Sequence, residues 1–196
     1  MDSDQELVTR ALDGDQQAFA KLVEAYQNSV YNLAYRMLGD GGEAEDAAQE
    51  AFIRAYRHLN SYDTSRSFKT WLLSIASNHC IDRIRKRRLI WLSLDDILPI
   101  HPALASPEPD PEEAAVEHER SAMIQKMLAE LSAEHRAVIV LHYWYAMTCS
   151  EIAEALETTE STVKSRLFRA RQALAAQMQS QMGESKATTP AFSTAW

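Results

Sequence analysis

A group of basic, hydroxyl-bearing and aromatic residues near the end of the chain has the composition of a DNA-binding surface. The segment from Thr148 to Leu174 is predicted to form a short helix, a turn of about three residues and a longer helix, which is a helix-turn-helix arrangement. Apolar residues at three- and four-residue steps predict the inner face of the longer helix: Val163, Leu167, Ala170 and Leu174. The residues left outside that face are Thr162, Lys164, Ser165, Arg166, Phe168, Arg169 and Arg171. Because arginine and lysine bind guanine edges or phosphates, this surface favours contact with a DNA groove over the alternative of a solvated basic helix.

A second group of cations lies near the middle of the chain. It crowds the end of a long predicted helix, after Asn78, and consists of Arg83, Arg85, Lys86, Arg87 and Arg88. Tyr62, Phe68 and Trp71 lie in the loop and helix start before it. Cations can follow the phosphates of a single strand while exposed aromatic rings stack on its bases. Phe68 and Trp71 at helical spacing are also typical of a buried core, and arginine at a helix end complements the helix dipole. Five cations in six residues are more than the helix dipole requires, so the sequence predicts a second nucleic-acid-binding surface.

A polar ridge lies on the helix before these cations. Its residues follow one side of the helix at three- and four-residue steps: Asp46, Gln49, Glu50 and Arg54. Such a ridge is either a solvated face or a surface that binds a partner. The sequence has no recognisable nucleophile, metal-ligand cluster or phosphate-binding loop, so we expect neither enzymatic activity nor a cofactor. Cys80 and Cys149 fit no metal spacing and are expected to be packed thiols.

The elements that must position these residues are helical, because the 196 residues include only 5 glycines and 6 prolines. Helix starts are predicted at Ser3, in a capping box with Glu6, and at Asp15, whereas Gly14 and Gly39 are predicted helix ends. Two more helices are predicted over about 43–59 and from Phe68 onward, with a loop over 60–67. These four helices are predicted to form a first domain over residues 1–92.

The second half of the chain begins with a predicted linker over residues 93–119, where five prolines fall between positions 99 and 111. Its acidic run consists of Asp95, Asp96, Glu108, Asp110, Glu112 and Glu113. A second helical domain is predicted over 120–182, with caps at Ser132 and Thr159 and a capping box of Thr148 and Glu151. The tail over 183–196 has no helical period and is expected to be mobile. The predicted fold class is therefore all-α, as two small helical domains joined by an acidic, proline-rich linker.

The formal net charge of −8, from 20 basic and 28 acidic residues, argues at first against nucleic acid as a ligand. Divided along the chain, it is −1 over residues 1–92, −7 over 93–122 and zero over 123–196. The excess acid thus belongs to the linker and leaves both basic surfaces intact. A composition of 46% apolar and 24% charged residues excludes general disorder. The acidic start and the absence of an apolar stretch of roughly 20 residues predict a cytoplasmic protein with no direct membrane insertion.

Several separated motifs together resemble a bacterial RNA polymerase sigma factor of the extracytoplasmic-function (ECF) group in the sigma-70 family. They are DAAQEAFIRAYRHL, SFKTWLLSIASNHCIDRIRKRR, LAELSAEHRAVIVLHYW and SEIAEALETTESTVKSRLFRARQAL, and the resemblance covers about residues 4–92 and 120–180. It implies that the first domain is region 2, which binds the β′ clamp helices of core RNA polymerase and melts the promoter −10 element. It implies that the second domain is region 4, which binds the −35 element and the β flap.

The resemblance also implies residue roles. Asp46, Gln49, Glu50 and Arg54 fall on the polymerase-binding helix. The residues that fall where the family captures the unpaired −10 strand are Ser61, Tyr62, Lys69, Asn78, Arg83, Arg85, Lys86, Arg87 and Arg88. The exposed residues of the last helix fall on the −35 recognition helix. An anti-sigma factor is implied as a further partner. The linker is implied to thread through polymerase, where its acidic run either imitates nucleic acid or acts as a solvated tether.

The chain departs from the family pattern at two positions, since Glu157 and Ser161 stand where glycine is common. Glu157 occupies a turn position that prefers a positive φ, so a different turn geometry or recognition-helix angle is one expectation. Two other functions remain open on the residues alone. A stand-alone helix-turn-helix regulator would bind a palindromic duplex as a dimer without polymerase. An all-helical adaptor would explain the polar ridge but leaves both groups of cations unexplained.

Overall fold

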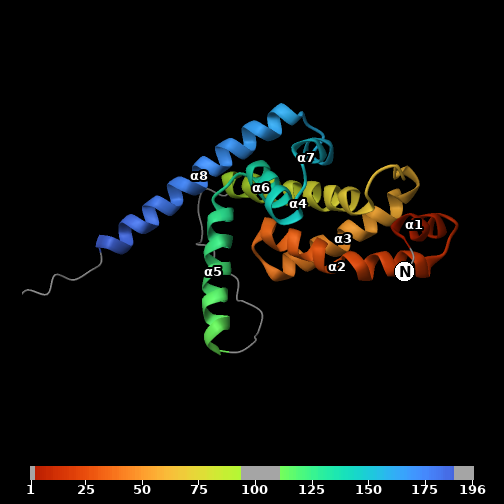
Figure 1. Ribbon diagram of the computed structural model, residues 1–196, viewed down its shortest axis with the longest axis horizontal. Coiled ribbons are helices and arrows are strands. Elements are labelled where there is room, and N and C mark those ends of the chain that lie inside the picture. The colour runs from red at the N-terminus through yellow and green to blue at the C-terminus, as the bar shows by residue number, and fades with distance from the viewer. Residues whose placement is uncertain (1–2, 94–110, 188–196) are drawn as a thin grey trace, which may run out of the picture.

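The computed structural model describes residues 3–93 and 111–187, and the elements in these ranges are helical (Figure 1). The first half contains α1 (Asp4–Leu12), α2 (Gln16–Leu38), α3 (Gly41–His58), the 3-10 turn η1 (Leu59–Ser61) and α4 (Phe68–Ser93). The second half contains α5 (Pro111–Ala129), α6 (Ala133–Tyr145), α7 (Cys149–Ala155) and α8 (Glu160–Ala187). The all-α fold class predicted from the sequence is confirmed over these residues. None of the described helices combines the length and apolar character needed to cross a membrane.

The first half is a bundle in which α2, α3 and α4 pack on one another and α1 lies against α2. Leucines of α2 and α4 provide the large side chains of its core, including the fully buried Leu22, Leu33 and Leu72. The side of α3 that faces them is lined mainly by small residues, because Ala44, Ala47, Ala51 and Ala55 are all fully buried and Phe52 packs at its edge. Small side chains let the helix backbones approach closely. The outer side of α3 is thereby left to longer polar residues.

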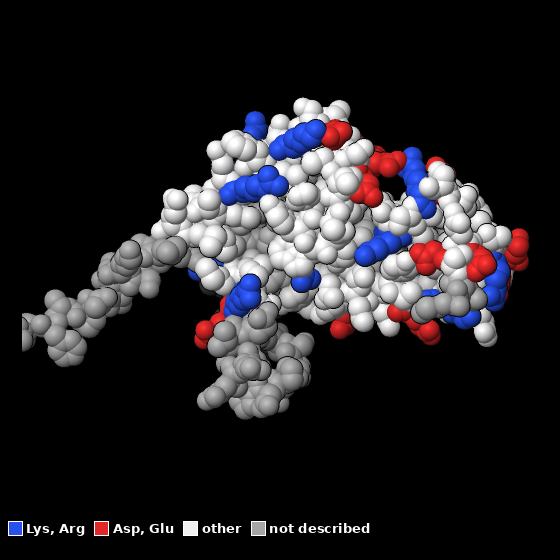
Figure 2. Space-filling model, viewed as in Figure 1, with Lys and Arg blue, Asp and Glu red and all other residues white. Residues whose placement is uncertain are grey.

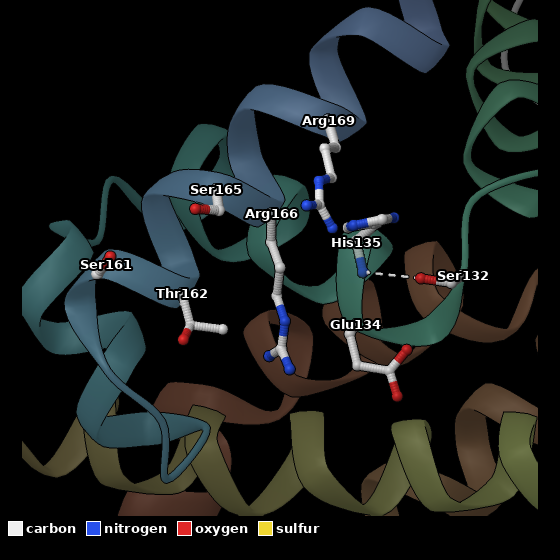
Figure 3. A pocket seen from close by; sticks show the side chains of 8 residues that line it. All are labelled: Ser132, Glu134, His135, Ser161, Thr162, Ser165, Arg166 and Arg169. Atoms are coloured by element: carbon white, nitrogen blue, oxygen red, sulfur yellow. Dashed lines mark hydrogen bonds between the residues drawn. The ribbon is translucent and has the colours of Figure 1, made fainter.

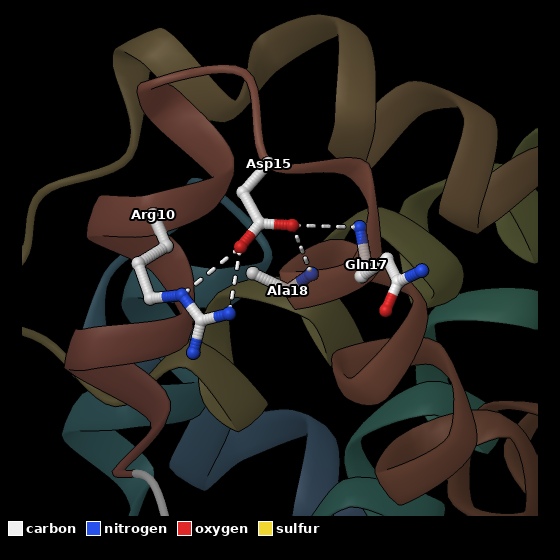
Figure 4. A network of polar contacts seen from close by, with 4 residues as sticks. All are labelled: Arg10, Asp15, Gln17 and Ala18. Carbon is white, nitrogen blue, oxygen red and sulfur yellow. Dashed lines mark hydrogen bonds and ion pairs between the residues drawn. The ribbon is translucent and has the colours of Figure 1, made fainter.

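The turn between α1 and α2 is fixed by one carboxylate (Figure 4). Asp15 accepts hydrogen bonds from the backbone N–H groups of Gln17 and Ala18 at 3.0 and 3.1 Å, which makes it the N-cap predicted for α2. Its other oxygen lies 2.7 Å from an Nη atom of Arg10 in the last turn of α1. The hydrogen bonds from Arg10 and from the Ala18 backbone hold the pKa of Asp15 below its ordinary value. The cap therefore stays charged to a lower pH than a free carboxyl would.

The start of α4 anchors the loop over residues 60–67 through a cluster of aromatic rings. Phe68 is fully buried and its ring centroid lies 5.7 Å from those of both Tyr26 and Tyr62, and 5.8 Å from that of Trp71. The Tyr62 hydroxyl donates to the carbonyl of Arg66, and the side chain of Gln5 in α1 donates to the carbonyl of Thr64. The loop is thus held on the bundle by the packing of Tyr62 in the aromatic cluster and by the hydrogen bond from Gln5.

Further along α4, the thiol of Cys80 is fully buried, and burial raises its pKa to about 12. This agrees with the packed position predicted for Cys80.

Two boundaries of the second half differ from the sequence-based expectation. Helix α5 begins at Pro111, inside the stretch predicted as linker. Proline is tolerated at this position because the backbone N–H that it lacks has no partner within the first turn of a helix. Helix α8 continues to Ala187, through the start of the predicted tail at Gly183. A single glycine costs about 1 kcal/mol in a helix interior, and the flanking methionine, glutamate, lysine and alanine residues favour the helix. Asp95, Asp96, Glu108, Asp110 and the end of the tail lie outside the described residues.

The two halves pack directly against each other. Helix α6 lies on α2 and α4, α7 lies on α4, and α5 contacts α2 (Figure 1). Arg136 of α6, only 7% exposed, donates to the carbonyl oxygens of Met37, Ala129 and Leu131. It therefore joins the C-terminal ends of α2 and α5. The Tyr145 hydroxyl also donates to the carbonyl of Ser29 at 2.6 Å.

Candidate nucleic-acid and polymerase-binding surfaces

The helix-turn-helix of α7 and α8 begins with the caps that the sequence predicts. The Thr148 hydroxyl accepts from the backbone N–H of Glu151 at 3.2 Å, and the Glu151 carboxylate accepts from the backbone N–H of Thr148 at 2.8 Å. Thr159 caps α8 by accepting from the N–H of Thr162 at 3.2 Å. Ile152, Val163, Leu167 and Ala170 are buried between α6, α7 and α8. This core fixes the orientation of α8 and leaves its polar faces outside.

The turn between α7 and α8 adopts the left-handed backbone geometry without glycine. Glu157 has φ of 49°, and the backbone N–H of Thr158 donates to the carbonyl of Ala153 at 2.8 Å. The chain therefore keeps the turn geometry that favours glycine and accepts the strain of a side chain there. Glu157 therefore does not change the shape of the turn, which was one of the expectations from the sequence.

We expect Glu157→Gly to raise the free energy of unfolding by about 1 kcal/mol, because glycine adopts a positive φ without the clash of a Cβ atom. Urea unfolding followed by circular dichroism measures the change. Glu157→Ala is the matched control, since it removes the same carboxylate and keeps the Cβ atom. Equal stabilisation by both variants would assign the effect to charge and contradict the backbone explanation.

The outer surface of α8 carries the residues predicted to meet DNA. Ser161, Lys164, Ser165, Phe168, Arg169 and Arg171 are exposed, and Phe168 retains 60% of its surface. Thr162 and Arg166 are half-buried. Figure 2 shows lysine and arginine side chains gathered where α8 runs along the molecule. Two of the cations have partners within the chain. Lys164 lies 2.6 Å from Glu160, and Arg171 donates to the Tyr143 hydroxyl at 2.8 Å.

Arg166 and Arg169 point into a hollow between the start of α6 and the start of α8 (Figure 3). The hollow has a volume of about 380 Å³, and its rim carries the hydroxyls of Ser161, Thr162 and Ser165 together with His135. Two guanidinium groups and three hydroxyls form a donor-rich surface that suits a phosphate backbone. Glu134 is the acidic residue in the lining. Although partial burial opposes it, hydrogen bonding to Arg85 of the first half lowers the pKa of Glu134.

The second predicted surface lies along α4 and the loop before it. Asn78 is half-buried, and Ser61 and Lys69 are exposed. Tyr62 is only 7% exposed and packs 5.0 Å from the ring of Trp71. In this arrangement the Tyr62 ring cannot stack on a base, and its place in the aromatic cluster makes it a support for the loop. Nothing in the sequence indicated that Tyr62 is buried, because it lies in a polar loop.

The cations after Asn78 follow α4 toward its end. Arg83 lies 3.9 Å from Asp46, Arg85 lies 2.6 Å from Glu134, and Arg87 pairs with Glu43. Within the described parts of the chain, Lys86 and Arg88 form no ion pair and are exposed. Exposed ion pairs of this kind contribute little stability each, so a phosphate backbone can compete for these arginines. The five cations therefore form a basic track along the end of α4.

The polar ridge of α3 is on the surface, as predicted. Asp46 and Gln49 are exposed, while Glu50 and Arg54 are partly covered and lie 2.7 Å apart in an ion pair. The hydrogen bond from Arg54 lowers the pKa of Glu50. Ile53 and Tyr56 lie on the same helix and keep 45% and 48% of their surface. The sequence analysis missed them, although they follow Gln49 by four and seven residues and so share its face. The ridge thus combines charges with apolar area, as protein-binding surfaces do.

The order of the two halves matches known families. The model of Sigma-70 region 2 matches residues 22–90, and that of Sigma-70, region 4 matches residues 121–174. The chain is 43% identical over 170 residues to the ECF RNA polymerase sigma factor SigW of Bacillus subtilis (strain 168), covering 84% of this chain and 91% of the relative. It is 35% identical to the RNA polymerase sigma-H factor of Pseudomonas aeruginosa, covering 88% and 92%.

Solved structures resemble the arrangement of both halves. The structure of CnrH in complex with the cytosolic domain of CnrY has a TM-score of 0.66 at 27% identity, covering 91% of this chain and 99% of that one. The sigma factor RpoE in complex with the anti-sigma factor NepR from Bartonella quintana has a TM-score of 0.61 at 23% identity, covering 82% and 96%. Because the identity to RpoE is only 23%, this likeness supports the fold alone.

Proposed function

The chain belongs to the ECF group of the sigma-70 family of RNA polymerase sigma factors, and from this premise we propose which of its surfaces direct promoter recognition, −10 melting and transcription initiation. The observation that carries the assignment is that two separate basic surfaces, on α4 and α8, fall within the two matched regions in the family's order. The stand-alone regulator is not favoured, because it requires only the helix-turn-helix half.

The first half, residues 1–92, is proposed to hold the unpaired −10 strand. Opening a promoter removes a base from the stack, which costs a few kcal/mol. The amide of Asn78, with Ser61 and Lys69 at the adjoining loop, can offset this cost by hydrogen bonding to the displaced base. The strand beyond it can follow the cations from Arg83 to Arg88, which lie on the exposed end of α4. Tyr62 contributes by holding the loop in place.

The second half, residues 120–182, is proposed to bind the −35 element through α8. Thr162, Lys164, Ser165, Arg166, Phe168, Arg169 and Arg171 lie on the faces of α8 turned away from its core. Arg166 and Arg169 line the same hollow as Ser161 and Ser165 at the helix start, where the dipole also favours a phosphate. Because each half offers few contacts, joining both on one polymerase raises the effective concentration of each for its element.

The ridge of Asp46, Gln49, Glu50 and Arg54, extended by Ile53 and Tyr56, is proposed to bind the β′ clamp helices of core RNA polymerase, and the second half to bind the β flap. An anti-sigma factor is proposed as a regulatory partner, and the similar CnrH was likewise solved with a protein partner. We propose that the protein acts in the cytoplasm and catalyses no reaction itself, since polymerase performs the chemistry.

Run-off transcription with core RNA polymerase tests the proposal. We expect transcripts from a cognate promoter only when protein and core enzyme are both present. Asn78→Ala is expected to lower the yield about 10-fold, equivalent to the loss of about 1.4 kcal/mol of strand binding. A template with a pre-opened −10 region should restore much of that yield, because the melting cost is already met.

Asn28→Ala is the matched control, since Asn28 is exposed on α2. It should leave the transcript yield unchanged. The assignment of Asn78 would be wrong if both variants behaved alike. The sigma-factor mechanism itself would be contradicted by a promoter footprint of the free protein as strong as that with core enzyme.

A further inference from the structure

The first turn of α8 presents an acid and a base side by side on the surface proposed to bind DNA. The Oε1 atom of Glu160 lies 2.6 Å from Nζ of Lys164, which follows it by one helical turn. The side chains of Glu160 and Lys164 keep 49% and 64% of their surface exposed. Glu160 is the one acidic residue between positions 160 and 180 of the sequence, a stretch that also contains four cations. A carboxylate therefore lies among cations on this helix.

The backbone that carries this pair is held in place. The Thr159 hydroxyl caps α8 by accepting from the N–H of Thr162 at 3.2 Å, and Val163 is fully buried beneath the pair's helix turn. The hydrogen bond from Lys164 to Glu160 and the charge of that carboxylate raise the pKa of Lys164, so its ammonium stays charged at neutral pH. The pair thus offers an acceptor beside a donor at the start of α8, which is the part of a recognition helix that contacts base edges.

A carboxylate at this place is unfavourable beside DNA unless it meets a hydrogen-bond donor, because the phosphates repel it. The donors in the major groove are the amino groups of cytosine and adenine. Glutamate characteristically accepts from cytosine N4, and lysine donates to guanine O6 and N7. A carboxylate in the first turn also stabilises a helix through the dipole. That structural role involves no DNA, so it predicts no preference for any base.

The spacing of the two side chains matches the edge of a single base pair. Guanine O6 and cytosine N4 are hydrogen-bonded to each other and lie roughly 2.9 Å apart. The donor and acceptor atoms of Lys164 and Glu160 are 2.6 Å apart, so the ammonium can bind O6 while the carboxylate accepts from N4. An A·T pair also offers an amino group beside a carbonyl oxygen. Thymine O4 lies next to a methyl group, however, whereas guanine O6 lies next to a second acceptor, N7, so the ammonium favours G·C.

We propose that Glu160 is a specificity-determining residue for the −35 element, which together with Lys164 recognises one G·C pair by accepting from the cytosine amino group. This inference rests on the proposed function of α8 and adds to it a residue whose charge argues against DNA binding. The carboxylate acts in two ways. It binds cytosine, and it disfavours base pairs that leave it without a donor, so it contributes to discrimination by rejection as well as by attraction.

The test measures which −35 sequences the holoenzyme selects. Core RNA polymerase carrying the protein or a variant is mixed with promoter-length duplexes randomised over the −35 and −10 blocks, and the bound sequences are counted. We expect the wild type to prefer cytosine at one −35 position. Glu160→Gln should shift that position toward adenine, because glutamine pairs with adenine N6 and N7, and Glu160→Ala should leave it without preference. Both variants should bind the wild-type site about 10-fold more weakly.

Glu130→Gln is the matched control, since it makes the same charge change at an exposed position of the same half. It should select the wild-type sequence. The same −35 preference in the wild type and in Glu160→Gln would overturn the role of Glu160 and leave the proposed function of α8 intact. Tighter binding of the wild-type site by Glu160→Ala would show that the carboxylate only repels phosphate, which also overturns it. If the wild-type holoenzyme selected no −35 sequence, the proposed function of α8 would fail together with this inference.

Discussion

Replacing Arg166 and Arg169 together by alanine is expected to lower run-off transcription about 100-fold from a promoter that depends on its −35 element. Both guanidinium groups point into the hollow at the start of α8, beside the hydroxyls of Thr162 and Ser165 (Figure 3). Arginine contacts to guanine edges or phosphates are worth about 1–3 kcal/mol each, so the loss of two produces an effect of this size. Neither side chain belongs to the buried core of α8.

The matched control is Arg120→Ala/Lys126→Ala, which removes two exposed cations from α5. It should retain nearly full transcription, because neither Arg120 nor Lys126 lines the hollow at the start of α8. The salt dependence of promoter binding should also become shallower for the Arg166 and Arg169 variant alone. A similar loss in both double variants would show that net charge matters and that the hollow is not the −35 contact.

The second large effect is expected for Arg136→Met, which should lower the free energy of unfolding by about 3 kcal/mol. The guanidinium is buried among three carbonyl oxygens at the ends of α2 and α5, and the described residues offer it no carboxylate. Burial, with a contribution from Arg87, lowers the pKa of Arg136 to about 10, so the group is still charged at neutral pH. Removing it leaves buried carbonyls without donors, and hydrogen bonds from charged groups are the costly ones to lose.

Urea unfolding at pH 7 followed by circular dichroism measures this change. Arg120→Met is the control, because it makes the same substitution at an exposed position of α5. Arg136→Lys should fall between the wild type and Arg136→Met, since one ammonium reaches fewer of the three carbonyls. A loss below about 1 kcal/mol for Arg136→Met would indicate that water satisfies the carbonyls and that the buried cation is not structurally required.

The sequence was sufficient where a feature depends on local chemistry. Ser3, Asp15, Thr148 and Thr159 cap the predicted helices, because an N-cap needs only a side-chain oxygen and a neighbouring backbone N–H. The buried stripe of α8 follows from helical spacing, since Val163, Leu167 and Ala170 are all buried. The left-handed turn at Glu157 was also indicated, although its residue type argued for a different geometry.

Features that depend on distant parts of the chain were not predictable in the same way. Tyr62 reads as a loop aromatic, and only its packing against Phe68 and Trp71 shows it to be a support. Arg136 reads as one more surface cation on an amphipathic helix, because its carbonyl partner at Met37 is 99 residues away. The start of α5 at Pro111 was not predicted, because the prolines before it indicate a non-helical linker. Proline is unfavourable inside a helix but is tolerated in its first turn, so the residue type alone does not distinguish the two cases.

Four of the hydrogen bonds between the halves share a feature that affects how the protein responds to mutation. Asn78, Gln125, Arg136 and Tyr145 each donate from a side chain to a backbone carbonyl, on Ala155, Tyr35, Met37 and Ser29 respectively. A carbonyl is present whatever residue occupies the acceptor position. Substitutions at the four donors therefore break these bonds, whereas most substitutions at the four acceptors leave them intact. A genetic screen for variants with separated halves should recover changes on the donor side, and the paired positions should show little mutual dependence in their amino-acid identity.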